Sequence, residues 1–272
     1  MKLLTLNTHS WMEENQDDKF ETLLDTILEE NYDLICLQEI NQLMTSQEVT
    51  ETPAYVATKG APAIHEDHYV YRLQKALAKH GKVYHWSWAY NHIGYDRYHE
   101  GVAVLSKTPI KAEAVLVSDV NDEKDHHTRR VLVGQTQVDG HEVLVISCHL
   151  SWWGQGFEEE WEQLTSYLED VNLPIIMMGD FNNPQGDQGY EMILESPLGL
   201  QDSHAIAKEV EGEFTIREDI DGWEGNTRNL KVDYIFTSKE LTVNSSKIIF
   251  DGKYKPVVSD HFGIAVEGEW GE

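Results

Sequence analysis

The sequence predicts an α/β protein in which two mixed β-sheets pack together and are covered by helices. The first observation is a strand–helix–strand pattern at the start of the chain. The second is a long series of short apolar runs, with helical periodicity between some of them, over the remainder. No internal repeat, low-complexity tract or Pro/Gly/Ser-rich linker interrupts the 272 residues, so we expect a single domain over residues 1–272.

The strand–helix–strand pattern comes first. Residues 3–7 and 33–38 are short apolar runs, and the second is continuous enough to predict a buried strand. Between them, residues 19–30 place apolar side chains three and four positions apart, which predicts an amphipathic helix. Asp17 or Asp18 is the expected N-cap, because a carboxylate there accepts hydrogen bonds from the free N–H groups of the first turn.

The rest of the chain mixes strands and helices. A loop-like region from residue 44 to about residue 66 follows the first strands. We then expect helices at residues 67–80, 157–170 and 187–195, and strands at residues 83–89, 101–106, 110–117, 130–138, 141–149, 174–179, 231–237, 242–250 and 261–267. Asp139-Gly140, between two of these runs, is a strong hairpin signal.

Composition excludes several classes of protein. Hydrophobic residues make up 40% and charged residues 25%, which excludes wholesale disorder and fibrous structure. Cys36 and Cys148 lie in apolar runs, and we expect buried, reduced thiols. The N-terminal apolar stretch is too short for a signal peptide, and no window approaches the ~20 apolar residues of a membrane-spanning helix. We therefore expect a cytoplasmic protein without a membrane partner.

The charge balance argues against a polyanionic partner. Lys and Arg number 21 and Asp and Glu number 48, so the formal net charge is −27 at pH 7. Proteins that bind duplex DNA usually recruit cations to neutralise its phosphates, and an anionic membrane surface repels an acidic protein. We therefore expect neither nucleic acid nor membrane as a partner, and nothing points to an obligate protein partner. A small anionic ligand is compatible with a bound metal ion that inverts the local field.

Polar residues gather where expected strands begin or end. They are Asn7, Gln38, Glu39, His149, Asp180, Asn182, Asp233, Ser259, Asp260 and His261. Taken singly, an Asn or Asp at a strand end is typical of a turn or cap. Asp233 differs, because it lies inside an apolar run, where an unpaired charge is costly to bury. If the set converges on one rim of the sandwich, it offers oxygen ligands for a hard cation and His and Asn donors for phosphoryl oxygens.

Segments along nearly the whole chain resemble the endonuclease/exonuclease/phosphatase superfamily, whose fold is DNase-I-like. In order, they are Leu6-Asn7-Thr8, Leu37-Gln38-Glu39, Glu100-Gly101-Val102-Ala103-Val104-Leu105-Ser106, Ser147-Cys148-His149-Leu150, Gly179-Asp180-Phe181-Asn182, Val232-Asp233-Tyr234-Ile235 and Ser259-Asp260-His261. The resemblance implies a four-layer αββα sandwich and Mg²⁺-dependent phosphoester cleavage, with Mn²⁺ as a substitute.

The same resemblance implies a metal site. Glu39 is expected to hold the ion, with Asn7 close by and Asp260 supporting the metal region. Carboxylate and water oxygens are the ligands that Mg²⁺ prefers. The number of ions stays open.

The resemblance also assigns catalytic roles. His261 is expected to bind the scissile phosphate and to be oriented by Asp233, which would keep its imidazole charged. Asp180 is expected to orient or deprotonate the attacking water. Asn182 and His149 are expected to donate hydrogen bonds to phosphoryl oxygens.

Tryptophans beside these motifs suggest how an organic group is bound. The chain has eight, and we interpret Trp86 and Trp161 as core residues. Trp152 and Trp153 directly follow the His149 segment, and Trp223 precedes the Asp233 segment. Indole faces stack well on the apolar faces of sugar rings, although the same side chains could stack a nucleobase.

Two further segments are candidates for the mouth of the site. Residues 90–100 are dense in polar and aromatic groups, including Tyr98, and are equally consistent with a surface loop. Residues 125–130 carry two His and two Arg, which predicts either a phosphate clamp or a solvated turn. We expect Arg130, which enters an apolar strand, to be the functional member.

The leading hypothesis is a Mg²⁺-dependent phosphomonoesterase that hydrolyses a small phosphorylated carbohydrate. The whole chain is similar to a cytoplasmic subgroup of the superfamily, from low-GC Gram-positive bacteria, that includes maltose 6'-phosphate phosphatase. Maltose 6'-phosphate is therefore the best candidate substrate. The alternatives are a metal-dependent nuclease acting on DNA or RNA and then a sphingomyelinase-like phosphodiesterase. A non-catalytic binding module would lack a catalytic residue, and none of the expected ones is missing.

Overall fold

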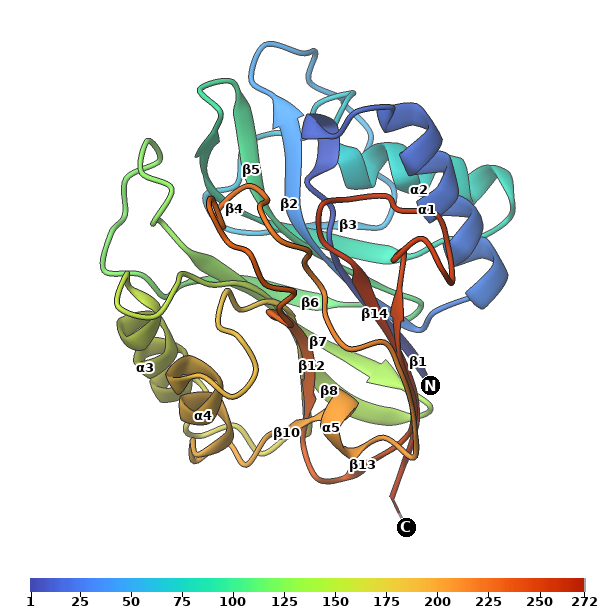
Figure 1. The fold of residues 1–272 in the computed structure, drawn as a ribbon. Coiled ribbons are helices and arrows are strands. Elements are labelled where there is room, and N and C mark those ends of the chain that lie inside the picture. Colours follow the sequence, from blue (N-terminus) through green and yellow to red (C-terminus); the bar gives the residue numbers. More distant parts are fainter. Residues whose placement is uncertain (272) are drawn as a thin grey trace.

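Two β-sheets packed against each other form the centre of the molecule, and helices cover their outer faces (Figure 1). This computed structural model describes residues 1–271. The larger sheet contains β1 (Lys2–Asn7), β2 (Leu34–Leu43), β3 (Tyr55–Ala57), β4 (His85–Gly94), β5 (Tyr98–Ser106), β11 (Glu209–Glu211), β13 (Leu241–Ile249) and β14 (Gly263–Trp270). The smaller sheet contains β6 (Lys111–Leu116), β7 (Arg130–Val138), β8 (His141–His149), β9 (Ile175–Asp180), β10 (Gln201–Asp202) and β12 (Asp233–Thr237).

Both sheets are mixed. The strand order is β11-β13-β14-β1-β2-β5-β4-β3 in the larger sheet and β10-β12-β9-β8-β7-β6 in the smaller one. In the larger sheet β1 runs parallel to β2 and antiparallel to β14. In the smaller sheet β9 runs parallel to β8 and antiparallel to β12. The prediction of an α/β sandwich is confirmed.

The helices divide between the two outer faces. α1 (Gln16–Glu30) and α2 (Tyr69–Lys79) cover the larger sheet, and α3 (Phe157–Tyr167) and α4 (Gln188–Leu194) cover the smaller one (Figure 1). A short helix, α5 (Ser203–Ile206), and a 3₁₀ turn at Ser10–Met12 complete the helical elements among the described residues. One apolar cluster lies between the sheets and one lies beneath each helical layer, so the sandwich has four layers.

Strand direction brings the polar strand ends to one edge of the sandwich. β1, β2, β8 and β9 all run toward this edge, whereas β12 and β14 start from it. In the register of the smaller sheet, Asp180 is paired with His149 on one side and Asp233 on the other. In the larger sheet, Asn7 is paired with Gln38. The expected convergence on one rim therefore follows from the topology.

Most expected elements are present, with shifted ends. α1 begins at Gln16 with Asn15 as its N-cap, so the prediction that Asp17 or Asp18 caps the helix is wrong. Both carboxylates lie in the first turn, where they interact favourably with the helix dipole. The short elements β3, β10, β11 and α5 were not expected, because two to four residues carry too little periodicity.

Several local predictions are confirmed. Cys36 and Cys148 are buried free thiols. Asp139 and Gly140 have φ of 52° and 84° and join β7 to β8, as a type I′ hairpin turn requires. Trp86 and Trp161 are core residues. Within residues 1–271, we find no helix with the length and apolar character needed to span a membrane.

Gly179, next to Asp180, lies where the backbones of β8 and β9 approach closely. Its φ is 149°, and a Cβ at this position would lie 2.0 Å from the carbonyl oxygen of Cys148. Flexible side chains can move away from such a clash, but paired backbones cannot. The position therefore requires glycine and holds Asp180 against the neighbouring strand.

We expect Gly179→Ala to lower the free energy of unfolding by about 3 kcal/mol or more, since the methyl group forces β8 and β9 apart. Gly140→Ala is the matched control, because Gly140 also has positive φ but no atom lies within 4 Å of its added Cβ. The free energy of unfolding of Gly140→Ala should fall by only about 1 kcal/mol. Urea unfolding curves measure both, and equal losses would contradict the close-approach argument.

Candidate active site

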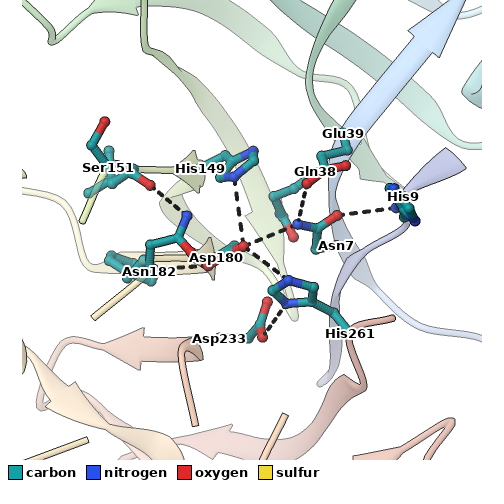
Figure 2. Close-up of polar contacts among 12 residues, drawn as sticks. Asn7, His9, Gln38, Glu39, His149, Ser151, Asp180, Asn182, Asp233 and His261 are labelled. Carbon is teal, nitrogen blue, oxygen red and sulfur yellow. Dashed lines mark hydrogen bonds and ion pairs between the residues drawn. The ribbon is translucent and has the colours of Figure 1, made fainter. Parts of the chain in front are cut away.

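Asp180 is the centre of the candidate site (Figure 2). Its carboxylate is buried and accepts hydrogen bonds from the backbone N–H of Asn182 at 2.9 Å and from Asn7 Nδ2 at 3.1 Å. Nε2 of His149 and Nε2 of His261 lie 3.7 and 3.6 Å from Asp180 Oδ2. Burial is the main reason that the pKa of Asp180 is raised, to about 7.

Asn7 joins the two sheets at this point. Its Nδ2 donates both to Asp180 Oδ2 and, at 2.9 Å, to Glu39 Oε1, while its Oδ1 accepts from the backbone N–H of His9 at 3.2 Å. Glu39 has φ of 53° and lies where the register between β2 and β5 shifts. This bulge directs its carboxylate to Asn7. Burial and the neighbouring charge of Glu100 raise the pKa of Glu39 to about 8.

Asp233 and His261 form a buried ion pair beside Asp180. His261 Nδ1 lies 2.9 Å from Asp233 Oδ2, which leaves Nε2 directed at Asp180 (Figure 2). Burial lowers the pKa of His261, but the carboxylates of Asp233 and Asp180 outweigh it, and the pKa is well above the ordinary range. The imidazole is therefore a cation at neutral pH and a donor at both nitrogens.

His149 has the opposite charge state. Burial, and then the positive charges of Arg129 and His261, hold its pKa well below the ordinary range. The ring is therefore neutral. Arg129 is buried, and among residues 1–271 its Nε and Nη1 have no hydrogen-bond partner. An unpaired buried guanidinium is costly, which indicates that an anion completes this part of the site.

These groups line a cavity of about 600 Å³. Its base holds Glu39, His149, Asp180, Asn182 and His261. Arg129 is buried in its wall, and its exposed lining includes Lys124 and the carboxylates of Asp96, Asp221 and Glu224. Beside His149 the cavity is thus basic, and toward solvent its carboxylates outnumber Lys124.

The donor set fits a hard divalent cation. Glu39 and Glu100 are two carboxylates close enough for the charge of one to raise the pKa of the other. Glu100 Oε2 is buried without a partner in the described part of the chain, and Asn7 adds an amide. A bound cation relieves this repulsion, and oxygen ligands favour Mg²⁺-type ions over softer metals.

Asp260 does not line the cavity but lies close to Glu39. Its Oδ2 is 3.7 Å from His9 Nδ1, and its negative charge contributes to the raised pKa of Glu39. Although burial lowers the pKa of His9, the carboxylates of Asp221 and Glu13 raise it to about 11. His9 is therefore a fixed cation among carboxylates. The backbone N–H of Asp260 also donates to Glu13 at 3.0 Å, so Asp260 belongs to a charged cluster next to Glu39.

The predicted substrate-binding aromatic residues lie in different places in the structure. Trp152 lines the cavity, while Trp153 and Trp223 lie in an adjoining groove. Tyr98 does not line either space: it is buried in the core beneath α1 and α2, with Arg97 over its ring. The prediction that it binds substrate is wrong.

Arg130 is also wrongly predicted. Its guanidinium donates to the carbonyl oxygens of Tyr90 and Asn91 at 3.2 Å and to Asn121 Oδ1 at 2.6 Å. All three acceptors belong to the scaffold, and the neighbouring Arg129 lines the cavity instead. Of the two arginines in residues 125–130, Arg129 and not Arg130 therefore reaches the cavity.

Sequence reasoning missed three groups at the site: Arg129, His9 and the pair His92–Glu100, whose Nε2 and Oε1 lie 3.4 Å apart. A signal was available for two of them. Glu100 opens one of the recognised segments, and Arg129 is a charge directly before an apolar strand. His9 carries no such signal, because it follows a strand by two residues in a turn.

A sequence model of the Endonuclease/Exonuclease/phosphatase family matches residues 11–261. The chain belongs to this family. Its members are metal-dependent phosphoric ester hydrolases, in agreement with the oxygen-rich site. The search of curated proteins found no match.

Solved structures of family members share the fold. An endonuclease/exonuclease/phosphatase family protein from Leptotrichia buccalis C-1013-b has 33% identity and a TM-score of 0.86, and the match covers 99% of this chain and 100% of that one. A mannosyl-6-phosphatase from Bacteroides thetaiotaomicron VPI-5482 has 17% identity and a TM-score of 0.68, with 99% and 100% covered. The human Nocturnin catalytic domain with bound sulfate anion has 17% identity and a TM-score of 0.69, with 100% and 93% covered.

We expect Asp233→Asn to lower the pKa of His261, because it removes the closest opposing charge. The folded-state pKa of His261 is raised, so the stability it contributes is fully present below its unfolded pKa of ~6.5 and is lost as the pH rises through the folded value. Titration of the imidazole NMR signals measures the pKa. Asp221→Asn, which alters a carboxylate that bonds to His9, is the control and should leave His261 unchanged. An unmoved pKa in Asp233→Asn would refute the pairing.

Proposed function

We propose that the protein is a Mg²⁺-dependent phosphomonoesterase that hydrolyses a phosphorylated sugar, with maltose 6'-phosphate as the best candidate. The observation that carries the proposal is Arg129, a buried guanidinium in the cavity wall whose Nε and Nη1 have no partner within residues 1–271. A phosphomonoester brings two negative charges and three terminal oxygens, whereas a diester brings one charge and two. The positive charge of Arg129, beside His149, can interact with the second negative charge of a phosphomonoester.

The residues of the chain divide the remaining work. Glu39 and Asn7 would hold the metal ion, which supplies charge neutralisation at the phosphoryl group when bound. His261, as an imidazolium, donates from Nε2 to a phosphoryl oxygen, and Asp233 holds it charged. Asn182 uses one amide N–H on the carbonyl oxygen of Leu150 and keeps the second for the substrate.

Asp180 completes the reaction as the group that receives the proton of the attacking water. Its raised pKa of about 7 makes the carboxylate a stronger base than an ordinary aspartate. The water oxygen forms the new bond to phosphorus as its proton passes to Asp180, and the ester P–O bond breaks. The sugar oxygen takes a proton from solvent, and Asp180 later returns its proton to solvent. The products are inorganic phosphate and the free sugar.

The acidic rim of the cavity favours a sugar over a nucleic acid. Asp96, Asp221 and Glu224 lie at the mouth, where the phosphates that flank a scissile bond in DNA or RNA would pass. These carboxylates repel a polyanion but accept hydrogen bonds from sugar hydroxyls. A substrate with a single phosphate needs only one anion pocket. The net charge of −27 also disfavours the binding of a polyanion such as DNA or RNA.

The first experiment measures phosphate release with Mg²⁺ from maltose 6'-phosphate, glucose 6-phosphate, nucleotides and an inositol phosphate, alongside plasmid nicking. We expect selective release from the sugar phosphates, and loss of turnover by at least about 100-fold in Glu39→Gln because the metal carboxylate is removed. Circular dichroism checks that the variant folds. Nicking without monoester turnover would replace the proposal with the nuclease alternative.

Arg129→Met tests the dianion argument. We expect kcat/KM for p-nitrophenyl phosphate to fall about 100-fold, the loss typical of a charge-assisted contact, and activity on bis-p-nitrophenyl phosphate to change far less. Arg130→Met is the matched control, because this neighbouring arginine bonds only scaffold oxygens. Equal losses on both esters would show that Arg129 does not read the extra charge.

A further inference from the structure

A second hollow, of about 540 Å³, adjoins the catalytic cavity. Trp152 and Asn182 line both spaces, so these two residues lie between them. We call the second hollow the tryptophan groove; its lining includes Trp152, Trp153, Trp223, Asn183, Asp187 and Arg228. Asn182 therefore borders the catalytic cavity on one side and the groove on the other.

The tryptophans of the groove are held in place by the catalytic segments. Trp223 Nε1 donates to Asn182 Oδ1 at 3.0 Å. A Cβ on Gly222 would lie 2.9 Å from Trp152 Cζ2, so only glycine lets this loop lie against the indole. Trp153 remains 40% exposed, in contrast to Trp86 and Trp161, which are fully buried in the core. The indole faces of the groove are thus positioned but not covered.

One buried polar atom of the residues that line the groove lacks a partner among the described residues: the donor Trp152 Nε1. Nearly all buried polar groups in proteins are hydrogen-bonded, so an unpaired donor points to a ligand with hydroxyl groups or to water in its place. Asp187, Gln188 and Arg228 of the lining offer further acceptors and donors for hydroxyl groups.

The charge of the lining limits the kind of ligand. Arg228 is its one cation and Asp187 its one carboxylate, so the groove as a whole is neutral. This composition gives no preference to a second phosphate. It suits a neutral group that has apolar faces for stacking and hydroxyls for hydrogen bonds.

We propose that the tryptophan groove binds a second, neutral hexose ring of the substrate alcohol, while the catalytic cavity holds the ring that carries the phosphate. This proposal rests on the proposed function, and it adds how the enzyme would select its substrate. It makes Trp153 and Trp152 stacking residues, and makes Trp152 Nε1, which has no partner within residues 1–271, a donor to a ring hydroxyl. The enzyme then discriminates disaccharide phosphates from monosaccharide phosphates outside the reacting centre.

The kinetic test compares maltose 6'-phosphate with glucose 6-phosphate in Trp153→Ala. We expect kcat/KM for the disaccharide phosphate to fall about tenfold, with a change of less than about twofold for the monosaccharide phosphate, since only the former fills the groove. Trp153→Phe should recover part of the loss. Tyr167→Ala, which removes a similarly exposed aromatic on α3, is the control. Equal effects of Trp153→Ala on both substrates would overturn the proposal.

A binding test separates the groove from the catalytic proposal. Maltose without phosphate is titrated up to about 100 mM, well above the Kd of a millimolar site, while tryptophan fluorescence is recorded. Saturable quenching that is lost in Trp153→Ala supports the groove even if no sugar phosphate is hydrolysed. Absence of quenching by maltose, or quenching by adenosine in its place, overturns it whatever the enzyme hydrolyses.

Discussion

The hydrogen bond from Asn7 to Asp180 is the contact on which the site depends, because it joins the ends of the two sheets at a buried carboxylate. Asp180 is a carboxylate in a position from which water is excluded, and ionising it there is costly. The Asn7 amide and the backbone N–H of Asn182 offset part of that cost. Separation of the two sheets at this edge would remove the Asn7 hydrogen bond from the buried carboxylate, so the fold and the site stabilise each other.

The two histidines beside Asp180 show how the same side chain acquires different properties from its surroundings. His261 has Asp233 at 2.9 Å and is charged, whereas His149 faces Arg129 and is neutral. Both rings are buried, so burial alone cannot account for the difference. The surrounding charges decide it, because carboxylates outweigh burial at His261, whereas the cations Arg129 and His261 add to the effect of burial at His149. A site for a phosphoryl group gains from this arrangement, because one imidazolium supplies charge and one neutral ring can donate or accept a proton.

The sequence revealed the residues at strand ends well, because each interrupts an apolar run and the strand directions carry them to one edge. Asn7, His149, Asp180 and Asp233 were found in this way. It could not distinguish Arg129 from Arg130. Adjacent residues in extended backbone point in opposite directions, and which one faces the cavity depends on the register of β7 with its neighbours. Tyr98 was misplaced for the same reason, because its ring faces the core beneath α1 and α2.

The net charge of −27 does not by itself explain why a phosphorylated substrate would enter an acidic protein. At physiological ionic strength the Debye length is about 8 Å, so most of the surface carboxylates are screened from the base of the cavity. Under the proposed function, a substrate phosphate would be governed instead by groups within the cavity, namely Arg129, His261 and a cation held at Glu39. The rest of a substrate would meet Asp96, Asp221 and Glu224 at the mouth. The argument against a polynucleotide therefore depends on where these three carboxylates lie, and the overall charge only agrees with it.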